Sequence, residues 1–251
     1  LSKLASNAIL AQRISSINSL SALCEKTGAD IDEVSLAVGM DSRIGKDFLK
    51  ASVGFGGSCF KKDILNLVYL SKFHGLDQVA KYWNQVLKIN DFQKSRFAQK
   101  VIDELNGAVS DKKISLLGWA FKKNTNDSRE SAAIDVADVL INEGAQISVY
   151  DPMVKKKNIF NDMKNFWTNN GDSKEDIKQK CSRIQVHNDI SKVIKDSFSI
   201  CILTEWDEFK EYNWEILIKS MKKPSIVLDG RSIIDKKSIE KFTNKFYCIG
   251  K

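Results

Sequence analysis

The second half of the chain, from Lys112 onward, alternates short apolar runs with amphipathic helical patterns, and this alternation limits the possible folds most strongly. The apolar runs predict β-strands at 112–120, 146–152, 183–189, 197–206, 225–231 and 246–250. The segments between them predict helices at 131–145, 189–196, 213–221 and 235–242. Strands that alternate with helices form a parallel, doubly wound sheet of the Rossmann-like kind. The polar segment 153–182 does not fit this alternation and is interpreted as an insertion.

The first part of the chain is predicted to be all-helical. Apolar residues recur near a 3.6-residue period from Leu1 to Gly28, and shorter helices are expected at 30–40 and from Ser58 or Cys59 to Gly75. A long helix is expected from about 78 to 105, either as a spine that joins two domains or as an oligomer interface. The predicted division is therefore a central helical domain at 1–107 and a Rossmann-like α/β domain at 108–251.

Composition excludes several classes of protein. There are 39 basic and 32 acidic side chains, and the resulting charge of +7 is scattered without a basic stripe, which disfavours a nucleic-acid binder. The five cysteines form no C-x-x-C pair, so reduced thiols in the cytosol are expected, and no zinc-ligand spacing is present. No apolar run is long enough for a membrane span. Since the chain starts without Met inside a helical pattern, it is expected to be a piece of a longer protein or a trimmed version of a complete one.

The stretch "VGFGGSCFKKD" at 53–63 places a cysteine behind a glycine turn, at a helix start. Free backbone N–H groups and the helix dipole at that position favour a thiolate at Cys59. Lys62 and Asp63 follow three and four residues later, so a nucleophile, a cation and a base could share one helix face. A small residue packed after a turn is the alternative.

Basic residues also follow the predicted strands, at the edge where doubly wound sheets bind ligands. Lys122, Lys123 and Arg129 lie between a strand and a helix, and Arg231 ends another strand. These side chains could hold phosphates; a solvated basic loop and a surface arginine are the alternatives. A G-x-G-x-x-G dinucleotide fingerprint is absent from the sequence.

Together with "LNLVYL", "GWAFKKNTNDSRES", "VYDP", "LTEWDEF" and "LDGR", the cysteine stretch resembles the UDP-glucose/GDP-mannose dehydrogenase family. The resemblance covers essentially the whole chain and is weakest over 153–185. Members have an N-terminal NAD-binding domain, a central helical domain and a C-terminal UDP-binding domain, and this chain resembles the last two. The resemblance implies an NAD-dependent enzyme that oxidises UDP-glucose twice, to UDP-glucuronate. A cytoplasmic location is expected from the unpaired cysteines, and no metal is expected because the zinc-ligand spacing is missing. The resemblance also implies a homodimer through the central helices, with a higher oligomer as the alternative, and a chain that is inactive without the NAD-binding domain.

The resemblance further implies roles for individual residues. Cys59 is the nucleophile, and Lys3 stabilises the developing oxyanion. Asn7 bonds the reacting sugar or a water, and Asp63 assists that water and Lys3. The residues that resemble substrate contacts are Arg43 (in a neighbouring subunit's site), Phe48, Leu49, Lys50, Ser52, Phe55, Gly56, Phe60, Phe121, Lys122 and Arg231. Contacts to NAD are expected from Lys62 and Arg129.

Two other interpretations stay open at this point. The stretch "FLKASVGFGGSCF" favours UDP-glucose within the family, but GDP-mannose or a UDP-N-acetyl sugar is the alternative substrate. A non-catalytic scaffold that retains the fold is the alternative from another functional class.

Overall fold

A computed structural model describes residues 1–243 and 245–251. The chain forms two compact units, one of residues 1–94 with 249–251 and the other of residues 95–248. Each unit is described by itself. The predicted combination of a helical part and a Rossmann-like α/β part is confirmed. The compact units divide inside a long helix, before the predicted domain boundary at 107, which stays a prediction.

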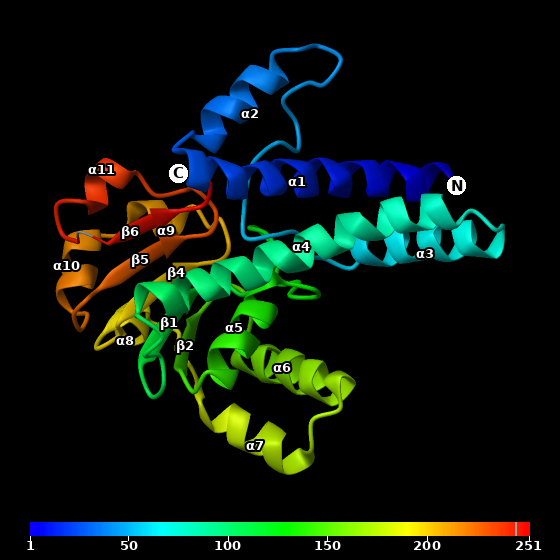
Figure 1. Ribbon diagram of the computed structural model, residues 1–251. Coiled ribbons are helices and arrows are strands. Elements are labelled where there is room, and N and C mark those ends of the chain that lie inside the picture. The colour runs from blue at the N-terminus through cyan, green and yellow to red at the C-terminus, as the bar shows by residue number, and fades with distance from the viewer. Residues whose placement is uncertain (244) are drawn as a thin grey trace. The chain divides into compact units, whose positions relative to one another are not determined.

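The first unit is helical (Figure 1). It contains α1 (Ser2–Thr27), α2 (Ile31–Gly39), α3 (Phe60–Phe73) and the first part of α4 (Asp77–Glu104), close to the predicted ranges. α1 ends at Gly28, whose φ of 77° is the left-handed conformation that glycine adopts without steric cost. α3 packs along α1. The buried side chains that these helices and the 51–57 loop share are Ala8, Ala11, Phe55, Ile64, Leu67, Val68, Ala80, Val86 and Leu87.

The last residues of the chain belong to the first unit, which the sequence did not indicate. The amide of Ile31 donates to the carbonyl of Gly250 at 2.9 Å, and the amide of Gly250 donates to Glu25 Oε1 at 2.8 Å. A Cβ at Gly250 would lie 2.3 Å from the Ile31 side chain, so only glycine fits there. The predicted strand at 246–250 therefore ends at Cys248.

The second unit is built on a six-stranded sheet in the order β3-β2-β1-β4-β5-β6, with every pair parallel. The strands are β1 (Lys113–Leu117), β2 (Gln146–Tyr150), β3 (Ile184–Val186), β4 (Ser199–Ile202), β5 (Ile226–Asp229) and β6 (Phe246–Cys248). Each of these strands lies within its predicted range. The order reverses direction between β3 and β4, so β1 and β4 flank the point where such sheets bind ligands.

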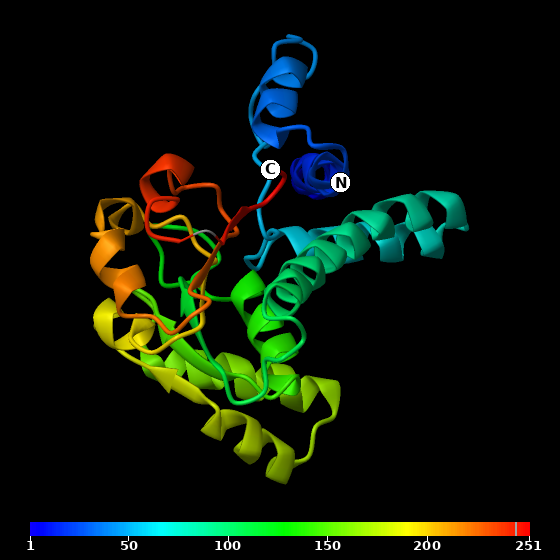
Figure 2. The ribbon, with the colours of Figure 1, turned by 60° about the vertical axis from the view of Figure 1, so that its left-hand side comes forward.

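Helices cover both faces of this sheet, as Figures 1 and 2 show. One face carries α5 (Ala132–Asn142) and α6 (Lys156–Asn170). The other carries α8 (Ile190–Ile194), α10 (Trp214–Lys219) and α11 (Lys236–Ile239). Because both faces are covered, strands β4 and β5 are buried along their whole length. Among the described helices, none combines the length and the apolar composition that crossing a membrane requires.

The interpretation of residues 153–182 as an insertion outside the pattern was wrong. This segment forms α6 and α7 (Lys174–Ser182), and α6 contributes to the core through Ile159, Met163 and Trp167, all 0% exposed. These three residues recur every four positions and make one narrow apolar stripe, which the surrounding Lys and Asn residues dilute in the sequence. The short helix α9 (Glu208–Glu211) was also missed, because a single turn leaves no periodic signal.

Gly118, directly after β1, gives a test of how tightly this edge of the sheet is packed. Its φ is 94°, and a Cβ there would lie 2.4 Å from the Cβ of Thr204. We expect Gly118→Ala to lower the free energy of unfolding by roughly 3 kcal/mol or more. The matched control is Gly171→Ala, which also has a positive φ but no neighbour within 4 Å, and should cost only about 1 kcal/mol. Equal losses in chemical denaturation would contradict the close contact.

Candidate active site

The cysteine singled out in the sequence lies at the N-terminus of α3. Cys59 is the N-cap residue, is exposed, and has Ser58 Oγ 3.8 Å from its sulfur. The backbone of Cys59 is already turned toward the helix, and its carbonyl accepts from the amide of Asp63. The thiol therefore lies at the N-terminus of a helix with access for a reactant, which is the placement that a nucleophilic cysteine requires.

Asp63 connects α3 to α1. Asp63 is 2% exposed, and its Oδ2 accepts a 2.6 Å hydrogen bond from the side-chain Nδ2 of Asn7. Lys3 is exposed and lies four residues, about one helical turn, before Asn7, so the two residues share a face of α1. The structure thus brings Asn7 and Asp63 together. The predicted approach of Lys3, Cys59 and Lys62 to this pair stays a prediction, since Lys3 and Lys62 are exposed.

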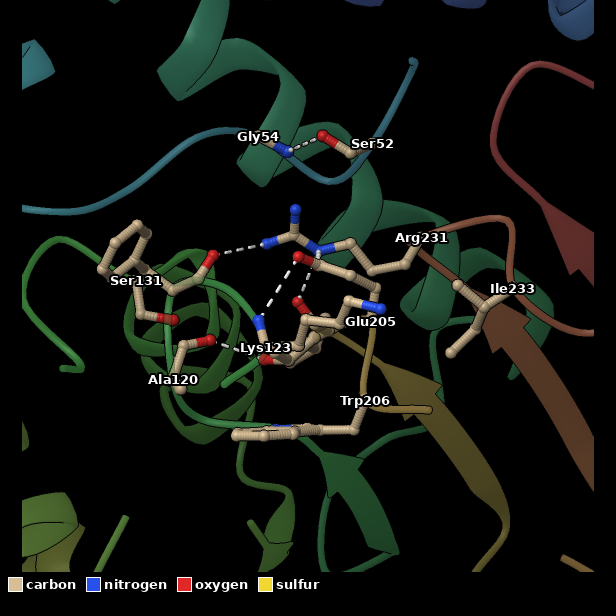
Figure 3. Close-up of polar contacts among 12 residues, drawn as sticks. Ser52, Gly54, Ala120, Lys123, Ser131, Glu205, Trp206, Arg231 and Ile233 are labelled. Atoms are coloured by element: carbon tan, nitrogen blue, oxygen red, sulfur yellow. Dashed lines mark hydrogen bonds and ion pairs between the residues drawn. The ribbon is translucent and has the colours of Figure 1, made fainter. Parts of the chain in front are cut away.

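The loop before α3 is extended and buried although it forms no regular secondary structure. Side-chain amides satisfy its backbone: Asn18 Oδ1 accepts from the Ser52 amide at 2.8 Å, and Asn90 Oδ1 from the Phe55 amide at 2.8 Å. Gln93 adds a bond to the Ser52 carbonyl, and the Ser52 hydroxyl accepts weakly from Gly54 at 3.4 Å (Figure 3). A buried loop needs such partners, because its unpaired backbone groups would be costly.

Residues from this loop that were expected to contact substrate differ in exposure. Ser52 and Phe55 are buried, and the Phe55 ring meets Phe60 edge-to-face at 5.6 Å. Leu49 is buried, whereas Lys50 is exposed and Gly56 is partly exposed. Phe48 is 43% exposed and has a φ of 60°, a strained conformation for an aromatic residue and one that points to a functional constraint.

An arginine that the sequence did not single out holds the preceding turn. The guanidinium of Arg13, on α1, donates to the carbonyls of Ile44, Gly45 and Asp47 at 2.7–2.9 Å. Arg43, in the same turn, is exposed and forms a two-pronged pair with Asp41 at 2.6 and 3.0 Å. The hydrogen bond from Arg43 holds the pKa of the Asp41 carboxyl below its ordinary value.

In the second unit, the β1–α5 connection meets an internal carboxylate. Asp151, which follows β2, accepts from the amides of Trp119 and Ala120 at 2.6 and 2.9 Å. Its second oxygen accepts from Met153 and Val154. In a dinucleotide-binding sheet, the amides after the first strand would face a pyrophosphate. Here the carboxylate occupies that position, so this turn does not fit a dinucleotide.

Arg231 lies beside the same connection, as Figure 3 shows. Its guanidinium donates to the Leu203 carbonyl at 2.7 Å and to the Phe121 carbonyl at 3.2 Å, and it lies 3.4 Å from Glu205 Oε2. The side chain is 11% exposed, so the interpretation as an ordinary surface arginine is excluded. Burial lowers the pKa of Arg231, while the negative charges of Glu205 and Asp229 oppose that shift.

Two buried or half-buried carboxylates organise the loops around Arg231. Asp229 is 0% exposed and accepts from the amides of Arg231, Ile233 and Ile234; burial raises the pKa of this carboxyl. Glu205 Oε1 accepts from the Lys123 amide at 3.3 Å, so it connects the β1–α5 loop to Arg231 (Figure 3). The two loops are therefore fixed to each other before any ligand arrives.

The remaining basic candidates point to solvent. Lys122 is exposed and lies over the Phe121 ring at 5.5 Å, and Lys62 is exposed on α3. Lys123 instead pairs with Asp207 at 2.7 Å, and that hydrogen bond is the main cause that lowers the pKa of Asp207 to about 2. Arg129 is exposed and paired with Asp127 at 2.7 Å. Lys62, Lys122 and Arg129 remain accessible for anionic ligands.

Several residues that organise the site had a signal in the sequence that was not used. Asp151 and Asp229 each stand at the end of a strand, and Glu205 follows β4 by three residues. At that edge of a parallel sheet, acidic residues face loop amides. Asn18, Asn90 and Gln93 had no such signal, because they lie on helix faces that look like any buried polar position.

No metal centre is indicated: within residues 1–243 and 245–251, no cluster of three His, Cys, Asp or Glu side chains could hold an ion. All five cysteines fall in the described part, and none of them forms a disulfide there. Cys201 is buried in β4, where burial raises the pKa of its thiol to about 12. Cys59 is the exposed thiol of the group, whereas Cys181 is half-buried.

Comparison with known families gives two matches that together cover most of the chain. Residues 1–92 match the model of the UDP-glucose/GDP-mannose dehydrogenase family, central domain. Residues 115–236 match the model of the UDP-glucose/GDP-mannose dehydrogenase family, UDP binding domain. The two matched ranges follow each other in the order expected from the resemblance.

Individual proteins give the same result. The chain is 50% identical to UDP-glucose 6-dehydrogenase 4 of Arabidopsis thaliana and 50% identical to UDP-glucose 6-dehydrogenase of Drosophila melanogaster, in both cases over 100% of this chain. It covers 53% and 52% of those proteins, so the chain spans about half the length of the curated relatives it matches.

Among solved structures, a UDP-glucose dehydrogenase from the archaeon Pyrobaculum islandicum superposes with a TM-score of 0.77 at 30% identity, over 100% of this chain and 50% of that chain. An NDP-N-acetyl-D-galactosaminuronic acid dehydrogenase from Methanosarcina mazei has a TM-score of 0.80 at 22% identity, over 100% of this chain and 50% of that chain, which supports the fold alone.

Proposed function

This chain belongs to the UDP-glucose/GDP-mannose dehydrogenase family, and from that premise we propose that it carries the catalytic and UDP-binding parts of a UDP-glucose 6-dehydrogenase. The protein that contains it would oxidise UDP-glucose to UDP-glucuronate in two steps. The observation that carries the proposal is the exposed Cys59 at the N-terminus of α3, close in sequence to Asp63 and its hydrogen bond to Asn7. The 50% identity to UDP-glucose 6-dehydrogenases favours UDP-glucose over other nucleotide sugars.

The chemistry of the first unit requires a thiol because one carbon is oxidised twice without release of the aldehyde. The Cys59 sulfur adds to the aldehyde carbon, and the carbonyl oxygen becomes the hydroxyl of a thiohemiacetal. Oxidation of that adduct leaves a thioester, and water cleaves the thioester to the acid and the free thiol. Lys3 stabilises the negative oxygen that develops. Asn7 and Asp63 hold and polarise the water, since their 2.6 Å hydrogen bond fixes both side chains.

The second unit supplies binding. Arg231, with Lys122 and Phe121, holds the diphosphate and the uridine, because a nearly buried guanidinium binds phosphate oxygens through directed hydrogen bonds. In the first unit, the loop from Phe48 to Phe60 contacts the glucose. These assignments rest on the family resemblance together with the exposure and the contacts of each residue.

NAD is the electron acceptor of the family, and when bound it takes up the hydrides that leave the sugar carbon. The first turn of the second unit does not fit it, because Asp151 already occupies the two amides at that position. The chain's own contributions are contacts from the exposed cations Lys62 and Arg129. The remainder of the NAD site is proposed to lie in another domain.

A cytoplasmic location is also proposed. It agrees with the five cysteines, which form no disulfide in the described structure.

We also propose that the first unit dimerises through its helices. Several apolar side chains on α3, in the turn after it and at the start of α4 are 42–72% exposed: Leu65, Tyr69, Phe73, Leu76, Val79 and Tyr82. A patch of this kind is typical of protein–protein contacts. In such a dimer, the exposed Arg43 would reach the partner's site.

The proposal is tested by titrating the chain with UDP, UDP-glucose, GDP-mannose and a UDP-N-acetyl sugar in a calorimeter. We expect UDP and UDP-glucose to bind and GDP-mannose to bind at least tenfold more weakly, as is typical when a buried polar group loses its partner. Preferential binding of GDP-mannose or of the N-acetyl sugar would transfer the assignment to another dehydrogenase of the family. Loss of all nucleotide binding would argue for the scaffold interpretation.

A further inference from the structure

We propose that Asp162, on α6, is a positioning residue for the loop of residues 118–131, which carries Phe121 and Lys122. The inference rests on the proposed function of that loop in UDP binding. It assigns a role to the polar segment that the sequence left unexplained: α6 fixes the nucleotide-binding loop, although it has no proposed contact with the nucleotide.

The evidence begins with two hydrogen bonds to one oxygen. Asp162 Oδ2 accepts from the indole N–H of Trp119 at 2.9 Å and from the hydroxyl of Ser128 at 2.6 Å. Trp119 and Ser128 lie near opposite ends of the loop, and both are buried, at 0% and 6% exposure. Hydrogen bonds to a carboxylate are stronger than neutral ones. One helical residue therefore joins both ends of a loop that has no ladder of its own.

Asp162 can act as an anchor because α6 is itself fixed. Ile159, Met163 and Trp167 hold α6 in the core at 0% exposure. The carboxylate of Asp162 thus projects from a rigid element, as the support of a binding group requires.

A second carboxylate anchors the backbone of the same loop. Asp151 accepts from the Trp119 and Ala120 amides, and Thr204 donates its hydroxyl to the Ala120 carbonyl at 2.6 Å. Asp151 does not bond the Trp119 side chain or Ser128. At the Ser128 end, the backbone bonds are internal to the loop: the Phe121 amide donates to the Asp127 carbonyl, and the Ser131 amide donates to the Ser128 carbonyl, both at 3.1 Å. Asp162 bonds both the Trp119 side chain and Ser128 to α6, and Phe121 and Lys122 lie between these two points. Without Asp162, the loop would keep its contacts to Glu205 and Arg231, but its two ends would have to be ordered when the nucleotide binds, and that ordering lowers affinity.

A pair of matched substitutions separates positioning from general stability. Trp119 and Trp167 are both 0% exposed, and each donates its indole N–H to a carboxylate in the same unit. Trp119→Phe removes the bond between the loop and Asp162. Trp167→Phe removes the bond to Asp138 Oδ1 on α5, at 2.6 Å, but keeps an apolar ring in the core, so α6 and the Asp162 carboxylate stay in place. We expect the melting temperatures of the two variants to fall by similar amounts. Only Trp119→Phe should bind UDP more weakly, by roughly tenfold in calorimetry.

Substitutions at Asp162 complete the test. Asp162→Asn keeps an acceptor oxygen and should bind UDP within about threefold of wild type, whereas Asp162→Ala and Ser128→Ala should each weaken UDP binding by about three- to tenfold. If Asp162→Ala fails to fold, Trp119→Phe and Ser128→Ala still decide the question. Wild-type affinity in Trp119→Phe, or an equal loss in Trp167→Phe, would overturn the positioning role. A wild-type chain that binds no UDP would overturn the proposed function of the loop and this inference together.

Discussion

Replacement of Cys59 by alanine is expected to lower the turnover of UDP-glucose by roughly four orders of magnitude or more, because the variant has no nucleophile for the covalent steps. The change is made in the full-length protein that carries this chain, and the appearance of reduced nicotinamide is followed by absorbance. UDP binding is expected to stay at the wild-type level, since Cys59 belongs to the first unit and the proposed UDP contacts Arg231, Lys122 and Phe121 belong to the second.

The control for this result is Cys181→Ala. Cys181 is half-buried on α7, and burial raises the pKa of its thiol. Its removal should leave turnover unchanged. If Cys59→Ala kept more than about a hundredth of the wild-type rate, a level within reach of acid–base catalysis without a covalent step, the thiol would be dispensable.

The second large effect is expected at Arg231. Arg231→Met should weaken UDP binding by roughly a hundredfold, since the variant loses a nearly buried, charged donor to phosphate. Arg231→Lys keeps the charge but lacks the planar fork whose separate nitrogens bond the Leu203 and Phe121 carbonyls, and we expect about a tenfold loss. Calorimetry with UDP measures both changes.

A substitution at a second arginine controls for loss of folding as the cause of weaker UDP binding. Arg183 is also half-buried in the second unit, where it donates to the Gly144 carbonyl at 2.6 Å and pairs with Asp111. It precedes β3 and so lies at the amino edge of the sheet, away from the expected ligand edge. Arg183→Lys should lower the melting temperature without a change in UDP affinity. Equal loss of affinity in the two lysine variants would remove the special role of Arg231.

The sequence predicted the regular part of the fold well, because its long periodic segments leave little choice. The range 78–105 was expected for a long helix, and α4 spans Asp77–Glu104. The run 197–206 contains β4 at Ser199–Ile202, and 225–231 contains β5 at Ile226–Asp229. Both strands are apolar, short and bounded by turn residues, which is the pattern of a central parallel strand.

What could not be predicted depends on contacts between residues far apart in the chain. The burial of Ile159, Met163 and Trp167 depends on the packing of α6 against α5. The role of Asp162 depends on its hydrogen bonds to the loop beside it. The pairing of Asn7 with Asp63 needs the packing of α1 on α3, which no local pattern specifies. Arg231 could be placed at the ligand edge by its position after a strand, but its burial required the whole sheet.

The central claim is that Cys59 forms a covalent bond to the sugar during oxidation. The most direct measurement is peptide mass mapping of the full-length protein after acid quench during turnover with UDP-glucose and NAD. We predict that the peptide containing Cys59 carries the mass of a UDP-glucuronyl thioester, and that the signal disappears in Cys59→Ala. Turnover with Cys59 unmodified at every time point, together with an active Cys59→Ala variant, would contradict the account.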